Sequence, residues 1–154
     1  MNSTKEDPRK ILAASKTILL VDWPNPGVPR ALINAGFTVY CHSPNGYTSA
    51  TLVDKLPTNT EAKSIFPPKN DYEKGYLVFS KIDSGPISVD IVNVYRPESE
   101  LPQIIQNLVL PLKAKILWMQ TTGTSALAQE LCNQNRIILL EELDIAEIAN
   151  DCRG

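Results

Sequence analysis

The sequence predicts an α/β fold in which helices cover both faces of a doubly wound, mostly parallel sheet. Short apolar runs alternate along the chain with amphipathic stretches, which is the pattern of strand–helix–strand units. Many of these runs are continuous, as expected for parallel strands that are buried on both faces. With 154 residues, 43% hydrophobic and 21% charged, the chain has the length and composition of one globular domain over residues 1–154.

The amino-terminal part predicts a leading helix followed by one complete strand–helix–strand unit. Asp7 is a suitable N-cap for the leading helix, and Pro8 suits its first position, where a missing N–H has no intrahelical role. Gly36 is a suitable C-cap for the second helix. The expected elements are helix Asp7–Ser15, strand Thr17–Val21, helix Val28–Ala35 and strand Phe37–Cys41.

The segment from Ser43 to Pro86 is expected to be a mostly irregular excursion. It is rich in Pro, Asn, Ser, Thr and Lys, and only Tyr76–Phe79 has the composition of a strand. Regular elements are expected again in the last part of the chain. They are strand Val89–Val94, helix Glu98–Leu110, strand Ala114–Met119, helix Ser125–Asn135, strand Arg136–Leu140 and helix Ile145–Asn150.

Charge and cysteine content argue against several classes of function. Fifteen Lys and Arg against seventeen Asp and Glu give a net charge of −2, so no overall positive field favours nucleic acid or an anionic membrane. No apolar stretch approaches the roughly 18 residues of a membrane span, and no leader is apparent, so we expect a cytoplasmic protein. The cysteines are then expected to be free thiols. They are Cys41, Cys132 and Cys152.

Patterns of catalytic chemistry are not apparent. His42 is the one histidine and has no Cys or carboxylate at ligand spacing, so we expect no metal site. No Gly-x-Ser-x-Gly elbow supports a hydrolase triad. A dehydrogenase that uses a dinucleotide is the weaker alternative, because strand Thr17–Val21 is not followed by Gly-x-Gly-x-x-Gly and Phe37–Cys41 is not followed by an acidic ribose partner.

Four turns are expected to lie together at one edge of the sheet. In doubly wound sheets the ligand crevice is found beyond the carboxyl ends of the strands, where the strand order reverses. The turns that follow the predicted strands are therefore the candidate site. They are Asp22 to Gly27, His42 to Gly46, Tyr95 to Pro97, and Gln120 to Gly123.

Three segments carry a resemblance to a known family. LLVDWPNPGVPRALINAGFTVYCHSPN, VDIVNVYRPESELPQII and AKILWMQTTGTSALAQELCNQNRIILL resemble, in order and spacing, the small stand-alone CoA-binding proteins of the Rossmann type. These proteins are related to the nucleotide-binding domain of succinyl-CoA synthetase α-subunits. The resemblance implies a Rossmann-like, NAD(P)-binding-like fold whose ligand is CoA, acyl-CoA or a related nucleotide.

The resemblance also assigns candidate ligand-binding residues to the four turns. The turn after the first strand would approach the phosphates, the turn after the second would lie near the adenosine end, and the other two would complete the crevice walls. The candidates are Asp22, Trp23, Pro24, Asn25, Pro26, Gly27, Ser43, Pro44, Tyr95, Arg96, Pro97, Gln120, Thr121, Thr122 and Gly123.

The chain departs from the family in its first turn. Asp22 and Trp23 stand where the family usually has Gly-Ala-Ser, and an acidic side chain there would oppose a pyrophosphate unless it points away. A second departure is Thr122, which stands where the family has glycine, with Gly123 one place later.

Two interpretations stay open for most of these residues. Arg96 contacts an anionic ligand or forms an ion pair with Glu98 or Glu100. Asp22 contacts the ligand or caps local backbone, and Gly27 serves ligand approach or turn geometry. The threonines at 121, 122 and 124 bind phosphate at the helix amino terminus or cap that helix. Trp118 is expected in the core, whereas Trp23 is free to stack on a base or a partner.

Two functions follow from these alternatives. In the first, the chain binds CoA, acyl-CoA or a related nucleotide in the crevice without catalysis by its own side chains. In the second, the altered first turn marks a divergent member that has lost CoA binding and acts through protein contacts or as a homo-oligomer. The excursion from Ser43 to Pro86 would then be the contact surface. The direction of the Asp22 and Trp23 side chains separates the two.

Overall fold

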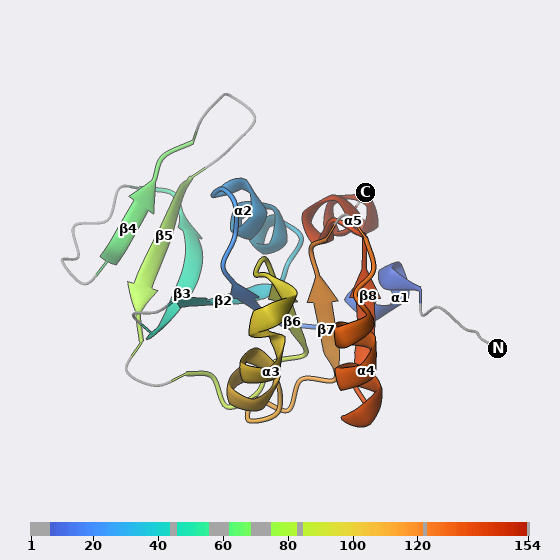
Figure 1. Ribbon diagram of the computed structural model, residues 1–154. Coiled ribbons are helices and arrows are strands. Elements are labelled where there is room, and N and C mark those ends of the chain that lie inside the picture. Colours follow the sequence, from blue (N-terminus) through green and yellow to red (C-terminus); the bar gives the residue numbers. More distant parts are fainter. Residues whose placement is uncertain are drawn as a thin grey trace.

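The computed structural model describes residues 7–43, 46–55, 62–68, 75–82, 85–121 and 123–153. The described strands are β1 (Thr17–Val21), β2 (Thr38–Ser43), β3 (Gly46–Val53), β4 (Ala62–Phe66), β5 (Tyr76–Lys81), β6 (Ile91–Val94), β7 (Ile116–Met119) and β8 (Ile138–Glu141). They form one sheet in the order β4-β5-β3-β2-β1-β6-β7-β8 (Figure 1). Strands β2, β1, β6, β7 and β8 are parallel, and the order reverses between β1 and β6.

Helices cover both faces of the parallel part, which confirms the predicted fold class. One core contains residues of α1 (Pro8–Ala13), α2 (Gly27–Asn34) and α5 (Ile145–Arg153). The other contains residues of α3 (Leu101–Ile104), of the π-helix η2 (Ile105–Val109) and of α4 (Ala126–Gln134). Strand β1 lies between the cores: Ile18 and Leu20 face the first, and Leu19 and Val21 face the second. Burial on both sides explains its continuous apolar sequence.

One polar side chain interrupts the parallel part. Asn93 of β6 lies in register between Leu20 and Trp118 and is 0% exposed. Among the described residues, neither its Oδ1 nor its Nδ2 has a hydrogen-bond partner. Trp118 is also fully buried but donates its indole N–H to the Leu143 carbonyl at 2.9 Å, as expected for a core tryptophan.

Strands β3, β4 and β5 extend the sheet beyond β2 as antiparallel neighbours. The prediction of a mostly irregular segment was therefore wrong for residues 46–53 and 62–66, and it was right only for the strand beginning at Tyr76. In β3 only Ala50 is fully buried, while the rest of the strand is partly or fully exposed. Polar residues such as Thr48 and Ser49 are tolerated in such a strand, so it lacks the continuous apolar run on which the prediction relied.

The extension is attached to α2 by a buried arginine and by aromatic contacts. Arg30, 4% exposed, donates from Nη1 to the Gly75 carbonyl and from Nη2 to the Phe66 carbonyl, each at 3.1 Å. Phe79 of β5 stacks on Trp23, with ring centroids 5.3 Å apart, and meets Phe66 edge-on at 5.8 Å. Polar and aromatic contacts therefore both connect β4 and β5 to the first turn and helix.

The predicted helix Glu98–Leu110 is divided into the 3-10 helix η1 (Glu98–Glu100), α3 and η2. Pro102 lies in the first turn of α3, where its missing N–H has no intrahelical partner to lose. In η2 the Leu110 N–H donates to the Ile105 carbonyl, five residues back, at 2.9 Å. The helix after β6 thus widens from α to π as it passes along the sheet.

Asp90 ties the amino ends of β1 and β6 together. Its Oδ2 accepts hydrogen bonds from the Lys16 N–H at 2.7 Å, the Thr17 N–H at 3.0 Å and the Thr17 hydroxyl at 3.2 Å. Partial burial raises the pKa of Asp90, but these hydrogen bonds outweigh it, so the pKa lies below its ordinary value. Asp90, which lies in one of the three segments that carry the family resemblance, thus has a structural role.

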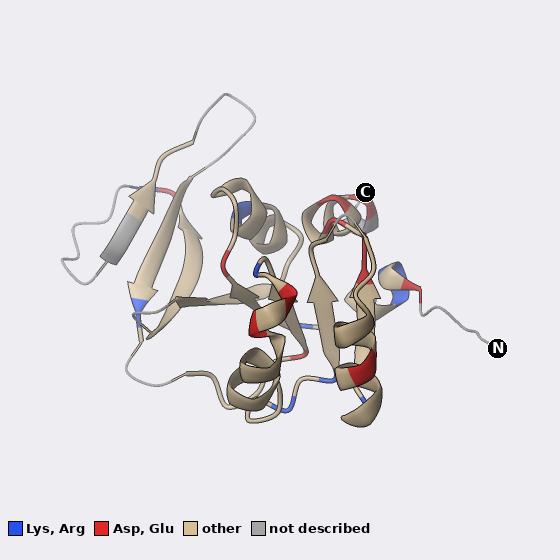
Figure 2. Cartoon of the chain, viewed as in Figure 1, with Lys and Arg blue, Asp and Glu red and all other residues tan. Residues whose placement is uncertain are grey.

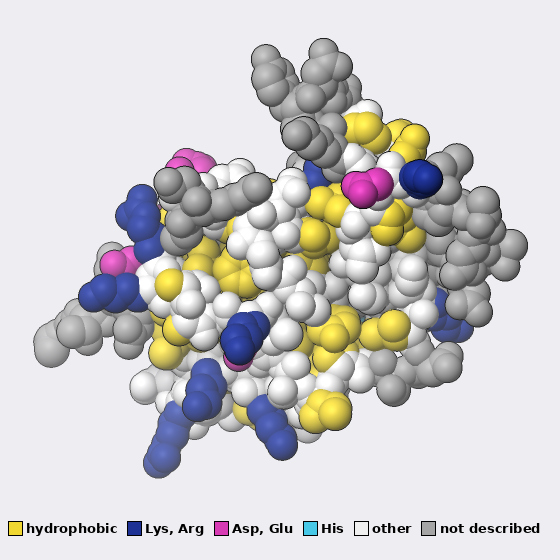
Figure 3. Space-filling view, turned by 180° about the vertical axis from the view of Figure 1, so that it is seen from behind, with side chains coloured by type: hydrophobic (Ala, Val, Ile, Leu, Met, Phe, Trp, Pro, Cys, Tyr) yellow, Lys and Arg dark blue, Asp and Glu magenta, His cyan; other side chains and the backbone are white. Residues whose placement is uncertain are grey.

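Charged and apolar surface is dispersed in the views shown. Basic and acidic positions are spread over many elements (Figure 2). From behind, hydrophobic side chains form several separate groups with polar surface between them (Figure 3). No helix among the described residues has the length and apolar composition needed to cross a bilayer.

Candidate functional site

A crevice of about 620 Å³ opens at the carboxyl ends of β1, β2 and β6. It lies at the strand-order reversal, where doubly wound sheets bind ligands, and its volume is within the roughly 300–1,000 Å³ usual for small-molecule sites. One wall consists of residues at the strand ends and another of the segment from η1 to η2. The residues from the strand ends are Val21, Asp22, Trp23, His42, Ser43 and Arg96.

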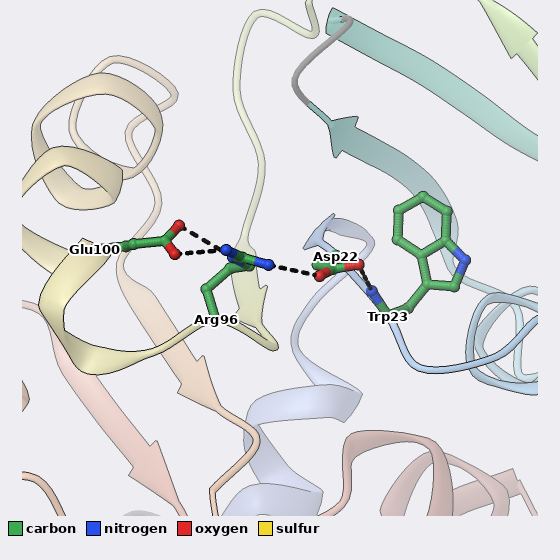
Figure 4. Close-up of polar contacts among 4 residues, drawn as sticks. All are labelled: Asp22, Trp23, Arg96 and Glu100. Atoms are coloured by element: carbon green, nitrogen blue, oxygen red, sulfur yellow. Dashed lines mark hydrogen bonds and ion pairs between the residues drawn. The ribbon is translucent and has the colours of Figure 1, made fainter.

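Asp22 opens the first turn in a left-handed backbone conformation, with φ of 66°. Aspartate tolerates this conformation because its short side chain can hydrogen-bond locally, and here Oδ1 accepts from the Trp23 N–H at 2.9 Å. The carboxylate lies between this amide and Arg96 (Figure 4). Asp22 therefore lines the crevice and also occupies a backbone donor that the turn would otherwise offer to a ligand.

Arg96 is held between two carboxylates (Figure 4). Its Nε and Nη2 donate to the two oxygens of Glu100 at 3.0 and 2.6 Å, and its Nη1 donates to Asp22 Oδ2 at 3.2 Å. These hydrogen bonds raise the pKa of Arg96, and the bond from Arg96 lowers that of Glu100. The predicted ion pair is thus formed with Glu100, while the guanidinium also lines the crevice.

The helical wall was missed by the sequence analysis. Its residues alternate between polar and apolar side chains, and two of them, Asn107 and Leu108, belong to the π-helix. Their spacing of i, i+3, i+4, i+7 and i+8 is that of one helix face directed at the turn after β6, which is the signal that could have identified them. They are Glu100, Gln103, Ile104, Asn107 and Leu108.

His42 and Ser43 reach the crevice from the end of β2. The His42 ring meets Tyr47 of β3 edge-on, with centroids 5.0 Å apart. Partial burial lowers the pKa of His42, which favours the neutral imidazole at neutral pH. His42, which begins the second of the four predicted turns, thus adds a mostly uncharged aromatic surface to the crevice.

The rest of the first turn bonds to itself. Asn25 Oδ1 accepts from the Gly27 N–H at 2.8 Å, and a Cβ at Gly27 would lie 2.8 Å from the same oxygen. This close approach explains the glycine through turn geometry, the second of the interpretations left open. Pro26 is the N-cap residue of α2, and neither it nor Pro24 lines the crevice.

The other predicted residues lie apart from this crevice or outside the described residues. Tyr95 packs against the α2 and α5 core, where burial and then the nearby Asp144 raise its pKa to about 12. The Gln120 side chain accepts from the Ile145 N–H at 2.9 Å, and the Thr121 hydroxyl donates to the Gly123 carbonyl. Pro97 precedes η1. Pro44 and Thr122 lie outside the described residues.

The amino terminus of α4 is filled by the protein's own side chains. Ser125, rather than the predicted threonines, is the N-cap, since its hydroxyl oxygen accepts from the Ala128 N–H at 3.1 Å. The Ser125 N–H donates to Glu141 Oε2 at 2.6 Å, and its hydroxyl donates to Glu98. Two glutamates thus bond to Ser125 at the helix terminus where one of the two open interpretations expected a ligand phosphate.

Among the described residues, no three His, Cys, Asp or Glu side chains gather in a way that could hold a metal ion. Burial raises the pKa of the Cys41 and Cys132 thiols to about 12 each, although a hydrogen bond with Thr48 lowers the first slightly and Glu141 raises the second further. Both thiols are therefore protonated at neutral pH.

Solved structures share the fold at low sequence identity. Prb, a form of the PH1109 protein redesigned for binding, has a TM-score of 0.65 and 18% identity, over 99% of this chain and 94% of its own. A hypothetical protein from Pyrococcus horikoshii OT3 has a TM-score of 0.61 and 16% identity, over 99% and 94%. The cell-free protein ID.343 from Thermus thermophilus has a TM-score of 0.55 and 20% identity, over 94% and 95%. At these identities the likeness establishes the fold.

The family is established by the sequence itself. A search of curated proteins found no match. Residues 23–145, most of the chain, match the family described as the CoA binding domain. This range starts in the turn after β1 and ends at the first residue of α5, so it includes the helical wall of the crevice. The chain therefore belongs to the CoA-binding domain family.

Proposed function

We propose that the chain binds CoA, acyl-CoA or a related nucleotide in the crevice at the carboxyl ends of β1, β2 and β6. The observation that carries the proposal is that a crevice of about 620 Å³ opens at the strand-order reversal and is lined by Arg96, in a member of the CoA-binding domain family. A guanidinium is well suited to contact phosphate, because it presents several N–H donors in a planar fork.

The lining residues fit a ligand with both charged and uncharged parts. Arg96 stands at the carboxyl end of β6, whereas Ile104 and Leu108 supply apolar surface and Gln103 and Asn107 supply amides. This mixture of apolar surface with a few polar groups is typical of small-molecule sites. The fit is poorest at Arg96 itself, because three of its five N–H donors are bonded to Asp22 and Glu100.

The proposal includes no catalysis by the chain's own side chains. The thiols of Cys41 and Cys132 are buried, and their raised pKa values make them poor nucleophiles. We also propose a cytoplasmic location, since free thiols persist in a reducing compartment.

A second candidate function rests on the first turn. The Asp22 carboxylate lies in the crevice, and Trp23 lines it while stacking on Phe79 of β5. This arrangement favours a divergent member that acts through protein contacts or as a homo-oligomer, with β3, β4 and β5 as the contact surface. This candidate would be favoured if none of the nucleotides tested binds and if the mass of the protein in solution increases with its concentration.

Native mass spectrometry followed by calorimetric titration tests the proposal. The first detects a ligand carried through purification, and the second measures binding of CoA, acetyl-CoA, NAD and ATP. Saturable micromolar binding of CoA or acetyl-CoA, with weaker binding of NAD and ATP, is expected. Absence of binding by CoA and acetyl-CoA would overturn the proposal.

Arg96→Ala should weaken CoA binding about five- to hundredfold, the range for loss of a charge-assisted hydrogen bond to the ligand. Titration calorimetry measures the change. The matched control is Lys115→Ala, which removes an exposed positive charge next to the amino end of β7, away from the crevice. An equal loss in both variants, or none in Arg96→Ala, would remove Arg96 from the site.

A further inference from the structure

Four N–H groups that could bind a phosphate at this edge of the sheet, three of them on Arg96, are bonded to carboxylate oxygens of the protein. Asp22 takes the Trp23 amide and one guanidinium nitrogen of Arg96, and Glu100 takes the other two nitrogens. Asp22 therefore bridges an amide and an arginine, and Glu100 makes a two-point contact with the same arginine. Phosphate oxygens bind amides and arginines in the same two ways.

The two carboxylates are held with different strength. Asp22 is fixed at both oxygens, because Oδ1 bonds its own turn while Oδ2 bonds Arg96. Glu100 bonds only Arg96 among the described residues, from a side chain 40% exposed to solvent. Glu100 is therefore the carboxylate that a ligand can displace.

We propose that Glu100 is an internal competitor for anionic ligands, so that a phosphate group makes a two-point contact with Nε and Nη2 of Arg96 only by displacing it, and that it thereby sets the charge selectivity of the crevice. This inference rests on the proposed function. It assigns the site a class of ligand: one whose uncharged part provides much of the affinity, with a phosphate that must compete for Arg96.

Charge in the crevice supports this selectivity. Its described lining residues include Asp22, Glu100 and Arg96 as the fully charged groups, which gives a net charge of −1. A phosphate entering that environment is repelled by two carboxylates and attracted by one guanidinium. Uncharged ligand groups meet no such cost at Val21, Ile104 and Leu108.

Calorimetric titration of the full chain with CoA and with pantetheine, which lacks the phosphates of CoA, tests the inference. Glu100→Gln keeps the size of the side chain but removes its charge, and it should bind CoA about five- to tenfold more tightly than the unmodified chain. Binding of pantetheine should be unchanged. Circular dichroism and thermal unfolding verify that the variant is folded.

A matched control separates displacement at Arg96 from a general change of charge. Glu130→Gln removes one negative charge from an exposed site on α4, where the carboxylate bonds Gln134 instead of Arg96. Its CoA affinity should stay within about twofold. A gain equal to that of Glu100→Gln would overturn the inference, because overall charge would then explain both.

The outcomes distinguish the inference from the proposed function. If the unmodified chain binds CoA and Glu100→Gln binds it no more tightly, the competitor role fails and the function stands. If only Glu100→Gln binds CoA, the competitor role stands and CoA binding by the unmodified chain fails. If neither protein binds CoA, both fail.

Discussion

The parallel strands and the antiparallel extension of the sheet are held by different contacts. Strands β1, β6 and β7 lie between two apolar cores, and their side chains are almost entirely buried on both faces. The extension pairs antiparallel with β2 and contributes Ala50, Leu77 and Phe79 to one core only, and Arg30 and the stacking of Phe79 on Trp23 add specific contacts. The comparison teaches that burial between two cores specifies the first region, whereas the second adds buried residues to one core and also depends on specific polar and aromatic contacts.

The largest loss of stability is expected when the contacts of Arg30 with the extension are removed. Arg30→Met keeps an apolar stem but leaves the Phe66 and Gly75 carbonyls without these donors, so the free energy of unfolding should fall by about 2–3 kcal/mol. Denaturant unfolding measures this loss. Hydrogen exchange should show earlier opening of β4 and β5 than of β6 and β7.

The control for Arg30 is Arg9→Met. Arg9 is exposed on α1, and its Nη2 lies 3.7 Å from Asp151, so its loss should cost less than about 0.5 kcal/mol. Equal loss of protection in β4 and β6 would show that the extension does not open separately, and the comparison between the two regions would then fail.

In the parallel region we expect a smaller effect, which is a gain in stability instead of a loss. Asn93→Leu replaces a buried amide that has no partner among the described residues with an apolar side chain of similar size. Because an unpartnered buried polar group is costly, the variant should be more stable by about 1–2 kcal/mol, measured by denaturant unfolding. A loss of stability would mean that Asn93 has a role in the folded chain that its surroundings do not reveal.

The smallest expected effect is on the pH dependence of stability, through Asp90. The pKa of Asp90 is lowered in the folded chain, so its contribution to stability is present above the unfolded pKa of about 3.9 and is lost as pH falls through the lower folded value. Asp90→Asn should therefore lose less stability than the unmodified chain between about pH 4 and pH 2. The difference should be below about 1 kcal/mol, because the side chain is largely exposed.

Thermal unfolding across this pH range measures that difference. Asp151→Asn on α5 is a suitable control, since its carboxylate lies at an exposed surface 3.7 Å from Arg9. Identical pH profiles for the unmodified chain and Asp90→Asn would show that the bonds to Lys16 and Thr17 do not couple protonation to folding.

Sequence patterns predicted the parallel region and some of the residues that line the crevice, because both depend on local rules. Strand β1 begins and ends where its apolar run does. The rule that ligands bind beyond strand ends identified Asp22, Trp23, Ser43 and Arg96, which do line the crevice. The pairing partner of Arg96 remained open between two glutamates, since sequence spacing does not fix which one faces the guanidinium.

The remaining features depend on contacts between distant segments. Strand β3 is recognisable only through its partners, because its residues are mostly half-buried. The roles of Ser125 and Glu141 depend on α4 meeting the end of β8, sixteen residues further along the chain. The helical spacing groups Asn107 with Gln103 and Ile104, but only the folded chain brings that helix face to the crevice at the end of β2.

The left-handed backbone at Asp22 has an evolutionary consequence. Glycine adopts this conformation most readily, so the turn is already shaped for the residue that would leave its amide open. Aspartate and glycine codons differ by one nucleotide. A single substitution, Asp22→Gly, would therefore remove the carboxylate from the turn and leave the Trp23 amide open without requiring a new backbone conformation.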